Sequence, residues 1–320
     1  MVGWDGQGLP PSAAARLERS RRSRLRTSLL GVPAAAAAES VDLTPVGEVM
    51  GSIVEHFGFQ GWGGCGWYGG RGWAGPAGWR RTGGLGGWAP GGSAGPGGFA
   101  GPGGWSGATV SSGGRDAYAG YGPYVQAVYR GYHTALDRML MEARGLGADG
   151  VIGVRLTVEH LGQSNREFVA LGTAVRAKSP LRPAAPFVTD LSGPDVAKAL
   201  RGGWVPVSLA IGISVAIRHD DWATLRQASA WINSEVSGYT ELVSQVRAEA
   251  RDQFAASAQR AAAETALVSR MDMRVWTIEP SEGHRDHVAE ATVIGTALVR
   301  FHPTVQAPTR ALTVLPLGSV

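Results

Sequence analysis

The sequence predicts an α+β protein that contains one structural unit twice, each copy a small, mostly antiparallel sheet packed with one long helix. Two observations support this fold class. The segments Phe168–Val175 and Thr292–Leu298 both carry Gly-Thr-Ala within the same hydrophobic frame. Each segment is preceded by the same order of predicted elements, namely helix, strand, turn and strand. A short motif recurs by chance, but four elements in one order indicate an internal repeat.

In the first copy, apolar residues recur at spacings of three and four from Tyr124 to Leu146, which predicts a helix that ends at Gly147. The segments Val151–His160 and Glu167–Ala177 are rich in Val, Leu and Phe and are separated by a polar turn, so they predict an antiparallel hairpin. Upstream, Val46–His56 is expected to match the long strand of the second copy.

In the second copy, Ser192–Asp195 predicts a helix start, with Ser as the cap and Pro and Asp in the first turn. The segment Val205–Ile217 alternates bulky and small side chains without exception, which predicts a strand whose bulky face fills a core. Its small face suits a helix backbone or a neighbouring subunit, and a core strand buried on both faces is the preferred interpretation. A second long helix is predicted over Ser237–Ala263, followed by a hairpin of Met271–Ile278 and Val288–Phe301.

Composition suggests the domain boundaries. The first domain is expected at residues 9–178 and the second at 189–303, with a C-terminal tail at 304–320. Three prolines within 179–188 oppose helix and sheet pairing, which makes this segment the linker. A tract at 61–114, dominated by Gly, containing six Trp and lacking acidic residues, predicts a flexible low-complexity insertion. The alternative is a segment whose aromatic and Arg side chains contact partner proteins or single-stranded nucleic acid.

Bulk properties exclude several classes of protein. The net charge is only +4 over 320 residues and the basic residues form no long stripe, so nucleic-acid binding by bulk electrostatics is not expected. The longest apolar run falls well short of the roughly 20 residues of a membrane-spanning helix, so no transmembrane segment is expected. The first residues lack the basic-then-apolar order of a secretory signal, which favours a cytoplasmic location.

The stretch Leu140–Val154, closed by Leu171–Val175, resembles the YbjQ family, also called UPF0145 or the heavy-metal-binding domain family. The resemblance combines Gly-Glu-Val-Met-Gly-Ser at Gly47–Ser52, a helix that ends in Ala-x-x-Leu-Gly-Ala-Asp, a Val-rich strand and the Gly-Thr-Ala ending. It extends over residues 42–178 apart from the insertion. A fainter resemblance over 189–303 lacks the Leu-Gly-Ala-Asp turn, which makes the second copy divergent.

The resemblance implies a small α+β domain that assembles into rings, commonly pentamers, without an established catalytic activity. Its metal-binding label implies no defined ligand set. If five identical domains form a ring, two-domain chains do not fill it evenly. We therefore expect either five chains in two stacked rings, one of first domains and one of second domains, or an intrachain pair that buries the same faces.

Three loop segments offer ligands for a divalent transition metal, the one cofactor considered. Two imidazoles, His284 and His287, flank Asp286, and a third precedes a pair of aspartates after the long strand. A fourth, His56, joins Cys65, the single cysteine, if the insertion folds back. None has the paired-Cys spacing of a structural zinc site, and a solvated turn accounts for each more simply. The candidate metal ligands are His56, Cys65, His219, Asp220, His284 and His287.

The sequence contains no recognisable catalytic motif. It has no Gly-x-Ser-x-Gly elbow, and no Gly-Lys-Ser/Thr follows the Gly-rich tract as a phosphate loop requires. The arginine-rich run within 16–26 is interpreted as a solvated helix face, with an anionic partner or membrane surface as the alternative. We predict a non-enzymatic, homo-oligomeric assembly or binding protein, with a heavy-metal-binding module that uses loop His and acidic residues as the alternative.

Overall fold

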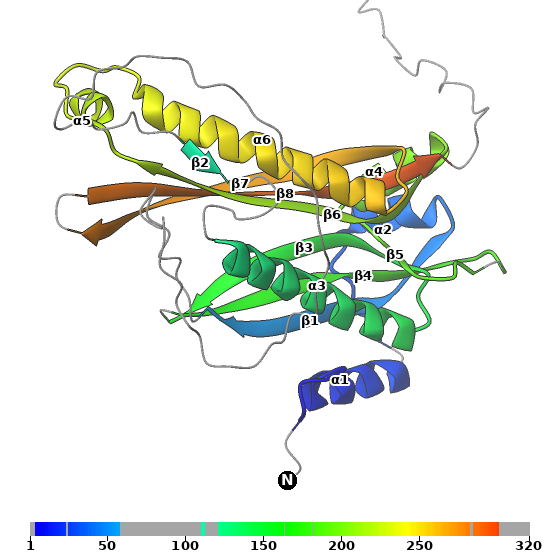
Figure 1. The fold of residues 1–320 in the computed structure, drawn as a ribbon. Coiled ribbons are helices and arrows are strands. Elements are labelled where there is room, and N and C mark those ends of the chain that lie inside the picture. Colours follow the sequence, from blue (N-terminus) through cyan, green and yellow to red (C-terminus); the bar gives the residue numbers. More distant parts are fainter. Residues whose placement is uncertain are drawn as a thin grey trace, which may run out of the picture.

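A computed structural model describes residues 4–23, 25–57, 110–112, 121–162, 164–180, 182–281 and 284–300, and shows a mixed α+β architecture with two four-stranded sheets (Figure 1). Sheet A has the strand order β1-β4-β3-β5 and sheet B the order β2-β6-β8-β7. The helices are α1 (Pro11–Arg22), α2 (Val32–Glu39), α3 (Gly122–Gly145), α4 (Gly193–Arg201), α5 (Trp222–Ala228) and α6 (Ser237–Arg260). The strands are β1 (Leu43–His56), β2 (Val110–Ser112), β3 (Gly150–Leu161), β4 (Asn165–Ala177), β5 (Phe187–Val188), β6 (Trp204–His219), β7 (Thr265–Ser281) and β8 (His284–Arg300).

Sheet A and α3 form the first half of the fold, as the sequence predicts. The strands β1, β4 and β3 are antiparallel neighbours, and β5 adds to β3 in parallel. The apolar stripe of α3 packs on this sheet. At the closest point Gly51 of β1 faces the helix backbone, where a Cβ atom would lie 2.0 Å from Ala135 O. Only glycine allows sheet and helix to approach so closely.

Sheet B confirms the prediction for the long alternating strand. In β6, Ile211, Ile213 and their bulky neighbours lie in the main core, while the small face packs against α6. A Cβ atom on Gly212 would lie 2.1 Å from Ala250 O of that helix. The strand is buried on both faces, as the preferred interpretation holds.

The main core lies between the two halves of the chain. The bulky face of β6 packs against α3, and one cluster joins Val128 of α3, Phe168 of β4 and Ile213 of β6. The hydroxyl oxygen of Tyr129 in α3 accepts a hydrogen bond from Ile213 N of this strand at 2.9 Å. The two halves of the chain therefore pack against each other within one chain.

Several elements differ from the prediction. The helices α2 and α5 and the strand β5 are additional, and β5 occupies the last two residues of the predicted linker. The strand β2, inside the predicted 61–114 insertion, pairs with β6. The strand β7 begins six residues before the predicted Met271. The remainder of that insertion, including Cys65, and the tail at 304–320 lie outside the described residues.

Among the helices that the structure describes, none has the length and apolar character needed to cross a membrane.

Candidate functional site: a cavity between the two sheets

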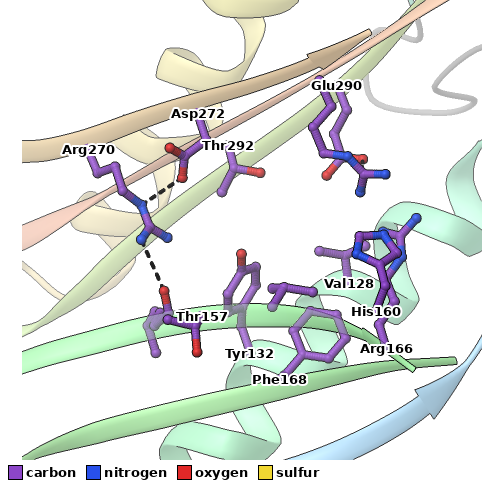
Figure 2. Close-up of a pocket in the computed structure, with 13 residues that line it drawn as sticks. Val128, Tyr132, Thr157, His160, Arg166, Phe168, Arg270, Asp272, Glu290 and Thr292 are labelled. Atoms are coloured by element: carbon purple, nitrogen blue, oxygen red, sulfur yellow. Dashed lines mark hydrogen bonds and ion pairs between the residues drawn. The ribbon is translucent and has the colours of Figure 1, made fainter. Parts of the chain in front are cut away.

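A cavity of about 330 Å³ lies between the inner face of sheet B and the surface formed by α3, β3 and β4 (Figure 2). This volume is at the small end of the range for ligand sites, roughly 300–1,000 Å³. Its wall combines apolar side chains from α3 and β4 with charged side chains from β7 and β8. The ionisable lining residues are Tyr132, His160, Arg166, Arg270, Asp272, Arg274 and Glu290.

The strand β7 supplies a charged row to the cavity. Arg270, Asp272 and Arg274 are alternate residues, and alternate side chains of a strand share one face. Across the sheet, Asp272 pairs with Thr292 and Arg274 with Glu290 of β8. The strand period therefore places cations and carboxylates side by side on the inner face.

Arg270 connects the two halves at one end of the cavity. Its Nε lies 2.6 Å from Asp272 Oδ2. Its Nη1 donates to the carbonyl oxygen of Leu156 in β3 at 3.1 Å (Figure 2). One guanidinium thus satisfies an acid of sheet B and a backbone acceptor of sheet A.

A buried hydrogen-bond chain connects the halves at the other end. The Tyr124 hydroxyl of α3 donates to Glu290 Oε2 at 2.5 Å, and Arg166 Nη1 of β4 donates to the same hydroxyl at 2.6 Å. Arg274 Nη1 lies 3.9 Å from Glu290 Oε2. The Arg166 guanidinium also stacks 4.7 Å from the centre of the Phe57 ring. The buried Glu290 carboxylate is therefore held by the Tyr124 hydroxyl of α3 and by Arg274 of β7.

The phenols near the cavity ionise with difficulty. Burial raises the pKa of Tyr124 above its ordinary range, and the Glu290 charge raises it further. Burial likewise raises the pKa of Tyr132 to about 12. Burial lowers the pKa of His160, and the nearby Arg274 and Arg166 lower it further. These directions favour a neutral Tyr132 and a neutral His160 beside three guanidinium groups.

Ionisation of Tyr132 predicts an alkaline loss of stability. Because the folded pKa of about 12 exceeds the ordinary tyrosine pKa of 10.0, the contribution of Tyr132 to stability is complete below pH 10 and is lost as the pH rises through 12. We expect the free energy of unfolding to fall across this window, and Tyr132→Phe to reduce that slope by up to about 1.4 kcal/mol per pH unit. Urea denaturation at about pH 8 and about pH 11 measures it. An identical pH dependence in the two proteins would contradict the assignment.

The lining can hold a small polar molecule. Three guanidinium groups face two carboxylates, and Tyr132, Thr157 and Thr292 add neutral hydroxyl groups. Sequence reasoning missed these residues because they come from distant segments. One signal was available: the alternation of Arg270, Asp272 and Arg274 marks a charged strand face.

The structure distributes the predicted metal ligands over separate places. His56 Nδ1 lies 2.9 Å from Asn165 Oδ1 at the open end of sheet A. His219 Nδ1 lies 2.7 Å from Asp286 Oδ1, because β6 and β8 pair these two residues directly. Cys65 and the side chain of His284 lie outside the described part of the chain.

The remaining candidates form a second pair beside the first. His287 Nε2 lies 3.1 Å from Asp220 Oδ2 and 2.9 Å from Tyr239 Oη. Within the described ranges, no three His, Cys, Asp or Glu side chains converge as a metal centre. The metal site therefore stays a prediction, and the contacts of these histidines are side-chain hydrogen bonds.

Comparison with known proteins places this chain in a family. The sequence model described as YbjQ_1, "Putative heavy-metal-binding", matches residues 108–178, which include α3, β3 and β4. A UPF0145 protein of Vibrio campbellii is 38% identical over 71 residues, which cover 20% of this chain and 68% of the relative. The chain belongs to the UPF0145 (YbjQ) family.

Two further relatives match this chain over part of their length. The encapsulin nanocompartment protein Rv1762c of Mycobacterium tuberculosis is 35% identical over 151 residues, which cover 43% of this chain and 56% of the relative. A UPF0145 protein of Halorubrum lacusprofundi is 46% identical over 55 residues, covering 17% and 53% respectively. The chain thus spans about half the length of these two relatives. No solved structure matches significantly.

Proposed function

We propose that this UPF0145 protein is a non-enzymatic assembly protein whose chain carries two YbjQ-like units, the second a divergent copy of the first. Strand register supports the duplication. Gly51 pairs with Ala170 in sheet A as Gly212 pairs with Val293 in sheet B. The register shifts next to a proline in both of these strands, after Pro45 in β1 and after Pro206 in β6.

The helices support the same correspondence. Both α3 and α6 have 24 residues, and each is approached by one sheet glycine. The Gly51 Cβ position faces Ala135 O and Met139 N of α3, and the Gly212 position faces Ala250 O and Phe254 N of α6. In both helices the two contacted residues are one turn apart.

The main support for an assembly role is the way in which the second unit packs on the first. The bulky face of β6 packs against α3, and β5, which leads into the second unit, extends sheet A. The two units therefore present different surfaces to each other. Such a head-to-tail contact, unlike a two-fold one, can repeat from chain to chain.

Similarity to a protein named for an encapsulin nanocompartment agrees with an assembly role. The same proposal includes a ring-shaped assembly of five chains and a cytoplasmic location. It also includes contacts of the 61–114 tract with partner proteins. The heavy-metal alternative draws its support from the family description. The paired His and Asp side chains at the end of sheet B would be its ligands, and binding of zinc, copper or nickel at micromolar levels in calorimetry would favour it.

Light scattering on the purified full chain tests the assembly role. We expect a mass that is a multiple of the 33.4 kDa chain. A control variant, in which the six Trp of the 61–114 tract are changed to Ser, is expected to keep that mass because the proposed contact between chains does not involve these Trp side chains. A mass of one chain for the unmodified protein would overturn the proposal.

A further inference from the structure

Corresponding positions of β3 and β7 differ sharply in exposure. In β3, Val151 and Ile152 are both 0% exposed. Their counterparts in β7 are Ala266 and Leu267, because Val151 pairs with Ala174 of the first Gly-Thr-Ala and Ala266 with Ala297 of the second. Leu267 is 46% exposed and the following Val268 is 52% exposed. One edge is covered and the other is open.

The cover on β3 is the segment that leads into α4. Phe187 N donates to Asp149 O and Thr189 N to Val151 O, at 3.1 and 3.0 Å. In return, Val154 N donates to Thr189 O and Gly153 N to Leu191 O, both at 3.0 Å. Parallel strand addition therefore uses residues 187–191. Among the described residues, β7 is the last strand of sheet B, with no strand on its outer edge.

The first unit has the same kind of segment. Residues 26–30 lead into α2 as 187–191 lead into α4, and both helices have Pro in the first turn. Both segments are anchored alike on their own sheets. Leu29 N donates to Thr173 Oγ1 at 3.1 Å, and Asp190 N donates to Thr296 Oγ1 at 3.3 Å. The two threonines are the central residues of the two Gly-Thr-Ala motifs.

The two segments differ in what lies on their outer side. Val188 and Thr189 are buried against β3, whereas residues 25–29 are exposed, with Leu25 at 76% and Leu29 at 41%. The first unit therefore holds an exposed segment in position without a strand beside it. The second unit holds an apolar strand edge without a segment beside it.

We infer that residues 26–30 of one chain add in parallel to residues 264–269 of a second copy of this chain. The inference rests on the proposed assembly role and names its contact. We take the hydrogen bonds that residues 187–191 make with β3 as the pattern for this contact. In the contact between copies, Arg26 N then donates to Glu264 O, and Ser28 N donates to Ala266 O, of the second copy. In return, Val268 N donates to Leu30 O and Ser269 N to Ser28 O. This is strand addition at a sheet edge.

The contact between copies is confined to the strands. In the intrachain contact, α4 also packs closely on α2, where a Cβ atom on Gly193 would lie 2.0 Å from Ala34 O. Val32 stands at the corresponding position of α2, and its side chain prevents the same approach. Because donor and acceptor are different surfaces, the contact generates rings or open chains rather than isolated two-fold dimers.

A disulfide trap tests the pairing in the full chain. Val188 and Val151 are direct partners in the intrachain pairing, which makes positions 27 and 266 the corresponding pair. Neighbouring strand positions fall within the roughly 4.4–6.8 Å between Cα atoms that a disulfide needs. In a Cys65→Ser background, Thr27→Cys with Ala266→Cys is expected to give interchain multimers on oxidation, with the 27–266 link identified by peptide mass spectrometry.

Two matched variants define the background of the trap. Thr27→Cys with Thr277→Cys places the second thiol at the far end of the same exposed strand, and we expect no specific link. Val151→Cys with Val188→Cys is expected to link within one chain, so on a denaturing, non-reducing gel it should run as a single chain of 33.4 kDa. These controls separate register-specific pairing from random oxidation.

A second measurement does not depend on thiols. Ser28→Pro removes the N–H that donates to Ala266 O, so we expect the light-scattering mass to fall to 33.4 kDa with an unchanged circular dichroism spectrum. Ser28→Ala keeps that N–H and should keep the wild-type mass. An oligomer that forms no 27–266 link and tolerates Ser28→Pro would overturn this contact while leaving the assembly role intact. A 27–266 link within one chain would overturn it in favour of intrachain closure, and a single-chain mass for the wild type would overturn both.

Discussion

Replacing Gly212 with Ala is expected to lower the free energy of unfolding by about 3 kcal/mol. The new Cβ atom would lie 2.1 Å from Ala250 O and 2.3 Å from Phe254 N, both backbone atoms of α6. A side chain cannot rotate away to relieve such a contact, so the helix must move off sheet B. Urea denaturation followed by circular dichroism measures the loss.

Gly31→Ala is the matched control for this substitution. Its nearest neighbour would be Pro33 Cδ at 3.9 Å, and its φ of −65° is available to any residue. We expect a change within about 1 kcal/mol, the usual scale for the loss of a favourable cap residue. If Gly212→Ala were no more destabilising than Gly31→Ala, the close packing of α6 on β6 would be wrong.

Phe168→Ala is expected to cost about 3–5 kcal/mol of unfolding free energy. Phe168 is 0% exposed and meets the Tyr132 ring edge-on at a centroid distance of 5.1 Å. On its other side it fills the space above Gly131, whose Cβ position lies 2.5 Å from the ring. The truncation leaves a cavity in the core that the two halves of the chain share. Thermal or urea denaturation of the full chain measures the effect.

Val54→Ala provides the comparison on the neighbouring strand β1. Val54 is 53% exposed, so its truncation should change the unfolding free energy by no more than about 0.5 kcal/mol. Equal effects of the two substitutions would show that Phe168 does not anchor the shared core.

The sequence was most informative where a pattern had one period and two clear faces. The alternation over Val205–Ile217 predicted both the strand and the opposite roles of its faces, and the structure extends it to Trp204–His219. The helix over Tyr124–Leu146 was similarly placed, because its apolar stripe and the following glycine define its ends. Such patterns depend on neighbours within a few residues.

The missed elements lack such a pattern. The helix α2 is a run of alanines with no amphipathic face, and β5 has only two residues that pair because β3 offers an open edge. The early part of β7 was missed since Thr265–Arg270 carries no strict alternation. These elements are fixed by tertiary contacts.

The candidate site could not be assembled from sequence alone. Tyr124, Arg166 and Glu290 meet only because sheet B lies over α3 and β4. The predicted metal ligands illustrate the reverse case. His219 and Asp220 adjoin in sequence, yet they have different partners, Asp286 and His287.

The bulky face of β6 has a consequence for how the chain can be divided. Its buried residues pack in the same core as α3 from the N-terminal half of the chain. They are Ile211, Ile213, Val215 and Ile217. A fragment cut at residues 179–188 would leave this aliphatic row facing water. Glu290 would also lose the Tyr124 hydroxyl that supports its charge. We therefore expect neither half to fold stably on its own, so genetic fusions or truncations need to keep both halves on one polypeptide.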